Sequence, residues 1–126
     1  ERQVPLDIYL SLNLPGETEQ GFRRTLALAE RIAQIYPPAL LRMFGQPHTV
    51  DPWSAMSLAP EEFGIEVSLL TFHDYYAYCQ QTAVHNPSLP IDARHGFCSL
   101  GREPDEMDRI ITQWRDFCRR QPFECE

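Results

Sequence analysis

The chain has 126 residues, of which 43% are hydrophobic and 23% are charged, and its formal net charge is −7. This composition suits one compact domain and excludes a disordered segment. The negative charge argues against nucleic acid or an anionic membrane as the main partner, and no apolar run is long enough to span a membrane.

The first predicted element is a β-strand that covers Val4–Leu14. Apolar and polar residues alternate along it, which is typical of a strand with one buried face. Pro15–Gly16 ends the strand, and Thr18 can cap a helix that follows. Ligands bind at the carboxyl ends of strands in α/β proteins, so we expect any site of this chain at the loop Asn13–Thr18.

A helix is predicted from Thr18 to about Tyr36, because apolar residues recur at three- and four-residue steps. Pro37–Pro38 ends this helix, and Ala39–Phe44 then has the length and apolar character of a second strand. A strand–helix–strand unit of this kind predicts parallel, right-handed pairing of the two strands.

The pattern places polar side chains of both strands on one face of the sheet. The apolar side of the first strand suits packing against helices, which leaves Asp7, Tyr9, Ser11 and Asn13 on the opposite side. Arg42 is costly to bury against a helix, so we place it on the same polar face. A simpler interpretation of Asp7 and Arg42 is an ion pair without a ligand.

The second half of the chain is predicted to be mainly helical, after a loop. Thr71 and Asp74 have the form of a capping box, which predicts a helix at Phe72–Thr82. Val84–Gly101 is rich in turn-forming residues and is predicted as a long loop. A last amphipathic helix is predicted at Pro104–Arg120. The inner face of the first of these helices is predicted to hold Phe72, Tyr75, Tyr76 and Cys79.

The cysteines and histidines form no recognisable metal-binding or catalytic motif. There is no CxxC pair and no CxxxCxxC of the kind that holds an iron–sulfur cluster. The even number of cysteines permits two disulfides, but reduced thiols in a cytoplasmic protein are the simpler interpretation. The histidines lack a partner at helical spacing, so no metal site is predicted. The residues concerned are Cys79, Cys98, Cys118, Cys125, His48, His73, His85 and His95.

Three segments, in order, resemble segments of one enzyme family. Asn13–Thr18 (NLPGET) resembles the GLPGET turn after a late barrel strand in radical S-adenosylmethionine enzymes, with Asn13 in place of the first glycine. Asp51–Ser54 (DPWS) resembles the PGS or PGT turn after the last strand, with Trp53 in place of glycine. Ala59–Tyr76 resembles the stretch that follows this turn in cobalamin-binding members.

The resemblance implies an α/β fold in which residues 1–58 are the last βαβ part of a partial (β/α) barrel. Residues 59–126 would be a mainly helical C-terminal extension. The chain would then be the C-terminal part of a cobalamin-dependent methyltransferase, and its start at Glu1 without a methionine also suggests a longer cytoplasmic protein. The remainder of that polypeptide, or a companion chain, would complete the barrel and supply the [4Fe–4S] cluster ligands and the cobalamin domain.

The resemblance also implies roles for particular residues, although it identifies no catalytic residue. The first strand and its loop would lie against the adenosine part of S-adenosylmethionine, with backbone groups of Leu12–Leu14 beside the adenine. The implied cofactor-binding residues are Ser11, Leu12, Asn13, Leu14 and Glu17. The implied contacts to a small-molecule or peptide substrate are Asp7, Tyr9, Arg42 and Trp53.

Two other interpretations remain open at this point. In the first, the chain is a small acidic α/β interaction module, in which NLPGET only starts a helix. In the second, it is an independent hydrolase or transferase with an unrecognised site. A lone pair of parallel strands is a poor core by itself, which favours the interpretation as part of a larger enzyme.

Overall fold

The computed structural model of the chain describes residues 4–82, 96–103 and 105–126. No helix within these ranges has both the length and the apolar character needed to cross a membrane. Two short 3₁₀ helices, Pro38–Leu40 and Pro60–Phe63, precede β2 and β3. The other elements, in chain order, are β1 (Leu6–Leu12), α1 (Glu19–Ile35), β2 (Leu41–Pro47), α2 (Ala55–Leu58), β3 (Ile65–Val67), α3 (Phe72–Thr82), β4 (Phe97–Ser99), α5 (Glu106–Arg119) and β5 (Glu124–Cys125).

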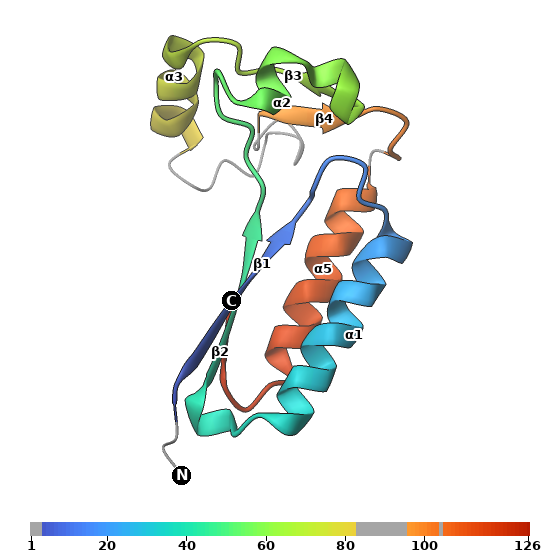
Figure 1. Ribbon diagram of the computed structural model, residues 1–126, viewed down its shortest axis with the longest axis vertical. Coiled ribbons are helices and arrows are strands. Elements are labelled where there is room, and N and C mark those ends of the chain that lie inside the picture. Colours follow the sequence, from blue (N-terminus) through green and yellow to red (C-terminus); the bar gives the residue numbers. More distant parts are fainter. Residues whose placement is uncertain (1–3, 83–95, 104) are drawn as a thin grey trace.

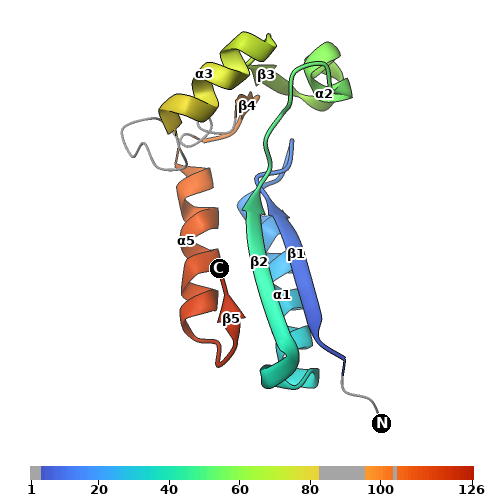
Figure 2. The same cartoon turned by 90° about the vertical axis from the view of Figure 1, so that its left-hand side faces the viewer.

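The larger part of the molecule is a three-stranded sheet with the order β1-β2-β5. All of its strands are parallel, so the predicted β1-α1-β2 crossover is confirmed. Helices α1 and α5 lie side by side on one face of this sheet (Figure 1), and in the view turned by 90° β1 and β2 stand in front of α1 (Figure 2). The sheet is open and does not close into a barrel.

The alternation within the strands decides which face packs against the helices. Leu12, Leu41 and Met43 are at most 2% exposed and point toward α1 and α5. Asp7, Tyr9 and Arg42 occupy the alternate positions and are exposed. For these residues the predicted apolar and polar faces are confirmed. The prediction is wrong for Asn13, which is completely buried, because β1 ends at Leu12 and the backbone at Asn13 turns to a positive φ. The helices contribute the rest of this core, chiefly Phe22, Ala29, Met107, Ile110, Trp114 and Phe117.

The ends of α1 and α5 follow from local sequence. Thr18 caps α1, because its Oγ1 accepts a hydrogen bond of 3.1 Å from the Gly21 N–H. The chain leaves the helix at Tyr36, before the prolines, as predicted. Helix α5 begins at Glu106, and Pro104, predicted to lie in its first turn, is outside the described residues.

A smaller unit lies beyond the carboxyl ends of β1 and β2 (Figure 1). Strands β3 and β4 pair antiparallel in it, and its buried cluster consists of Val50, Ile65 and Phe97. The prediction of an unbroken loop over residues 84–101 is wrong at β4, because a strand of three residues is too short to show a periodic pattern. The rest of that predicted loop, including His85 and His95, falls in residues 83–95, outside the described part.

The capping box of α3 is confirmed, but its predicted inner face is wrong. Asp74 Oδ2 accepts from the Thr71 N–H at 2.9 Å, and Thr71 Oγ1 accepts from the Asp74 N–H at 3.1 Å. Phe72 and Tyr76 are 66% and 62% exposed, whereas Tyr75 is half-buried. No other described helix or strand packs closely against α3, so Phe72 and Tyr76 remain in solvent.

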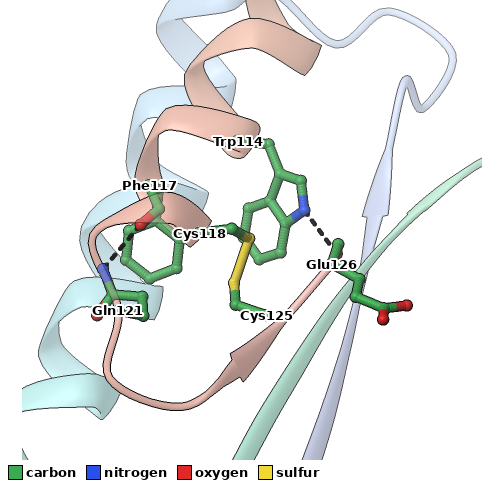
Figure 3. The surroundings of a disulfide bond; sticks show 6 residues. All are labelled: Trp114, Phe117, Cys118, Gln121, Cys125 and Glu126. Carbon is green, nitrogen blue, oxygen red and sulfur yellow. Dashed lines mark hydrogen bonds between the residues drawn. A yellow bond between two sulfur atoms is a disulfide. The ribbon is translucent and has the colours of Figure 1, made fainter.

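The C-terminal segment returns from α5 to the sheet. Cys118 of α5 and Cys125 of β5 form a disulfide with a Cα–Cα distance of 4.9 Å (Figure 3). The expectation of reduced thiols is therefore wrong for this pair. Both α5 and β5 come from the predicted C-terminal extension, yet they pack against the predicted barrel segment and complete its core.

Candidate functional site

The face of the three-stranded sheet that carries no helix holds most of the residues predicted to contact a substrate. We call it the open face and define it by Asp7, Tyr9, Ser11, Arg42, Phe44 and Glu124. The strand register places Asp7 beside Arg42 and Tyr9 beside Phe44. Glu124 of β5 lies beside Arg42 on its other side. Three strands thus bring polar and aromatic groups together on one face of the sheet.

Arg42 is held by a two-pronged ion pair on the open face. Its Nε and Nη2 donate to Asp7 Oδ1 and Oδ2, and both distances are 2.7 Å. The hydrogen bond to Asp7 raises the pKa of Arg42, and the charge of Glu124 adds a smaller contribution. The ion pair expected as the simpler interpretation is therefore present. The guanidinium is fixed in position while the Arg42 side chain as a whole remains 48% exposed, which leaves it accessible to a ligand.

Tyr9 and Phe44 form an aromatic surface next to this ion pair. Their ring centroids are 5.0 Å apart and the planes differ by 21°, so the rings are stacked. Tyr9 is 66% exposed. Phe44 is half-buried, so it is chiefly the Tyr9 ring of this flat pair that can contact a planar or apolar part of a ligand.

The loop after β1 contains a tight turn over Leu14–Glu17. The Glu17 N–H donates to the Leu14 carbonyl at 2.9 Å, with Pro15 second in the turn and Gly16 third at φ 71°. This is the arrangement of a type II turn. The Glu17 carboxylate in turn accepts from the Leu14 N–H at 3.3 Å. Burial raises the pKa of Glu17, and the hydrogen bond from Leu14 offsets this rise in part.

Arg102, which is distant in sequence, holds this loop in place through hydrogen bonds. Its guanidinium donates to Asn13 Oδ1 and, at 2.8 Å, to the Glu17 carbonyl. The Arg102 side chain is only 3% exposed, and Glu106 lies 4.0 Å from its Nε. Sequence analysis missed this residue, because a single arginine 89 positions from its partner leaves no local pattern.

Asn13 is the most unusual residue of the loop. It has a φ of 62° and is completely buried. Its Oδ1 accepts from Arg102, but its Nδ2 has no hydrogen-bond partner among the residues that the structure describes. A buried donor without a partner is costly. Asn13 Nδ2 is therefore the donor of this loop that would gain most from a hydrogen-bond acceptor.

A second turn of the same design follows β2. The Ser54 N–H donates to the Asp51 carbonyl at 3.2 Å, with Pro52 second in the turn and Trp53 third at φ 67°. The Trp53 side chain is 70% exposed.

A pocket of about 280 Å³ lies beside this turn. Val50, Met56 and Phe63 line it together with His48, Asp51 and Ser54.

The structure brings together some of the predicted site residues and separates others. Asp7, Tyr9, Ser11 and Arg42 share the open face. Leu12 turns its side chain into the core and is 2% exposed, so only its backbone can face a ligand. Trp53, Asn13, Leu14 and Glu17 lie in the loops at the carboxyl ends of the two long strands.

The open face and the two loops offer groups for binding and orientation. The Asp7–Arg42 ion pair lies at the amino ends of β1 and β2, whereas the loops follow their carboxyl ends. The groups are a fixed guanidinium, exposed carboxylates, an aromatic pair, a serine hydroxyl and a buried amide. Among the described residues, no group of three or more His, Cys, Asp or Glu side chains is arranged to hold a metal ion.

Comparisons with protein-family models, with curated proteins and with solved structures found no match to this chain.

Proposed function

We propose that the chain is the C-terminal part of a radical S-adenosylmethionine enzyme, a cobalamin-dependent methyltransferase. In this proposal β1-α1-β2 is the last part of a partial barrel. The open face and the two loops after β1 and β2 form walls of the chamber that holds cofactor and substrate. Other polypeptide supplies the remaining strands, the cluster ligands and the cobalamin domain.

The observation that carries the proposal is the backbone conformation at Asn13 and Trp53. These are the two positions at which the chain departs from glycine in the loops that resemble the family. They are also the two non-glycine residues with positive φ among the residues that the structure describes. This conformation is uncommon for residues other than glycine and is a genuine outlier for a bulky one. The glycine-like backbone at both positions supports a common origin of these loops with the two family turns.

The incomplete sheet gives further support. Parallel sheets occur almost only with both faces covered, yet here one face exposes Tyr9 and Arg42 and leaves Phe44 half-buried. One edge of β2 is covered by β5, whereas the outer edge of β1 has no strand partner in the part of the chain that the structure describes. A barrel segment would present this open face and this open edge to its missing strands.

The residues of the loop after β1 fit a role beside the adenosine. The unpartnered Asn13 Nδ2 can donate to an acceptor such as a ring nitrogen, once a ligand reaches it. Ser11 offers an exposed hydroxyl on the preceding strand. The cluster, when bound, supplies the electron that cleaves S-adenosylmethionine. The residues of this chain would orient the cofactor and keep water away from it.

On the substrate side, the residues would act by position and not by acid–base chemistry. Asp7 fixes the Arg42 guanidinium, whose outer edge can bind a carboxylate or amide of a small-molecule or peptide substrate. The Tyr9–Phe44 pair can contact an apolar portion of the same molecule.

The direct test is to purify, without oxygen, the native polypeptide in which this sequence occurs. We expect a brown protein with iron, sulfide and corrinoid absorbance, and an electron paramagnetic resonance signal from the reduced cluster that changes when S-adenosylmethionine is added. Arg42→Gln is expected to raise the KM for substrate. Arg24→Gln, on the exposed side of α1, is the matched control and should leave the KM unchanged.

A small acidic interaction module is the second candidate. The described residues bury two hydrophobic clusters without help from another chain, which favours a self-sufficient domain. A colourless native protein without iron or corrinoid would support this candidate and refute the methyltransferase.

A further inference from the structure

The C-terminal residues are fastened to the body of the molecule at three places. The disulfide joins Cys118 in α5 to Cys125 in β5. The indole Nε1 of Trp114 donates to the Glu126 carbonyl at 2.8 Å (Figure 3). On the sheet side, the Gly45 N–H donates to the same carbonyl at 2.6 Å, and the Glu126 N–H donates to the Met43 carbonyl at 3.1 Å.

Strand β5 is too short to hold its place by sheet pairing alone. It has two residues, and its register with β2 consists of two residue pairs. Strands in globular proteins usually have about five or six residues. The disulfide ties β5 to a long, well-packed helix, so the covalent bond is the strongest of the three attachments.

The position of β5 matters for the open face. Glu124 is exposed and lies beside Arg42, on the side away from Asp7. With β5 in place, Arg42 has a carboxylate on each side. Without β5, Arg42 keeps only Asp7 as a neighbour. Asp7, Arg42 and Glu124 together carry a net negative charge, whereas Asp7 and Arg42 alone are neutral.

The disulfide is accessible to small thiols and to proteins that carry reactive thiols. A surface pocket of about 380 Å³ is lined by both cysteines together with Arg115, Arg119 and Glu126. Both cysteine side chains are partly exposed, so a reactive thiolate can approach the sulfur atoms.

We propose that the Cys118–Cys125 disulfide is a redox latch for β5. A dithiol reductant of the thioredoxin class attacks one sulfur as a thiolate, forms a mixed disulfide with it and expels the other cysteine as a thiolate. The second thiol of the reductant then closes its own disulfide and releases the first cysteine. Two electrons pass to the chain, the two cysteines end as thiols after protonation, and β5 leaves the edge of β2. Regulation of the open face by this latch rests on the proposed function, but the latch itself does not.

Amide hydrogen exchange of the ¹⁵N-labelled chain tests the latch. The Gly45 amide is the reporter, because its bond to Glu126 exists only while the C-terminal segment is docked. The control is the His48 amide, which donates to the Leu12 carbonyl at 2.8 Å and does not depend on β5. Reduction with dithiothreitol should speed exchange at Gly45 at least tenfold and leave His48 unchanged. Unchanged exchange at Gly45, or an equal loss of protection at both amides, would overturn the proposal.

Two variants separate the latch from its effect on the open face. Cys118→Ser combined with Cys125→Ser should show fast exchange at Gly45 with or without reductant, and slow exchange would overturn the latch. Glu124→Gln in the oxidised chain should leave Gly45 protected, while it moves the Arg42 Nε–H resonance in the same direction as reduction does. If reduction frees Gly45 but leaves this resonance in place, the effect on the open face is refuted. None of these outcomes depends on iron or corrinoid in the native protein.

Discussion

The contact between Trp114 and Gly45 allows a sharp test of how the core is packed. A Cβ at Gly45 would lie 2.3 Å from the indole Nε1 and 2.5 Å from Cε2. The ring is 2% exposed and fully enclosed, so it has to move in Gly45→Ala. Any movement also disturbs the hydrogen bond from Nε1 to the Glu126 carbonyl.

The expected loss follows from these two effects. Adding a methyl group to a filled core typically costs about 1–3 kcal/mol, and loss of one hydrogen bond adds about 0.5–1.5 kcal/mol. We therefore expect Gly45→Ala to lower the free energy of unfolding by about 2–4 kcal/mol. This is a large share of the stability of a small domain, so the urea midpoint should fall clearly.

Urea unfolding followed by far-ultraviolet circular dichroism measures this change. Gly21→Ala is the matched control, because its Cβ would meet Thr18 Oγ1 at 3.5 Å, an ordinary contact. Alanine is favoured over glycine in a helix by about 0.5–1 kcal/mol, so the control should change stability in the opposite direction. In a Trp114→Leu background, most of the penalty at Gly45 should disappear, since the clashing ring is gone. A loss below about 0.5 kcal/mol in Gly45→Ala would refute the packing argument.

Three further predictions use the same unfolding assay. Arg102→Met should lower the free energy of unfolding by about 1–3 kcal/mol, because it leaves the buried Asn13 Oδ1 without a donor; an unchanged midpoint would contradict the role of Arg102. Burial raises the folded-state pKa of Glu17, so the stability that protonated Glu17 contributes is present at acid pH and is lost as pH rises through that pKa. Glu17→Gln should therefore gain stability relative to wild type as pH rises toward 7, and a difference that is constant with pH would contradict this. Thr18→Ala removes the cap that binds the Gly21 N–H and should lower the free energy of unfolding by about 1 kcal/mol, whereas no loss would show that water replaces the cap.

The parts of the fold that could be predicted are those in which one residue pattern decides one structural choice. In β1 the alternation from Leu6 to Leu12 admits only one buried face, and in β2 the charge of Arg42 excludes burial against helices. The parallel pairing of β1 and β2, predicted from the strand–helix–strand pattern, places the loops that follow them at the same end of the sheet. Proline and glycine predict breaks in the chain at these positions, but they do not reveal which residues hold each turn in place.

The remaining features could not be predicted because they depend on contacts between distant residues. Two residues are too few for β5 to show any periodicity. Four cysteines allow three pairings, so no sequence rule selects Cys118 and Cys125. Arg102 looks like an ordinary surface residue until the fold places it under Asn13.

The separation of the buried residues into two clusters means that resistance to local unfolding is uneven. The cluster around Val50, Ile65 and Phe97 is much the smaller, so the unit that contains β3 and β4 should open at a lower free energy than the three-stranded sheet. That unit lies beyond the carboxyl ends of β1 and β2 (Figure 1). A molecule approaching these strand ends therefore meets a unit that should open locally while the main sheet stays intact.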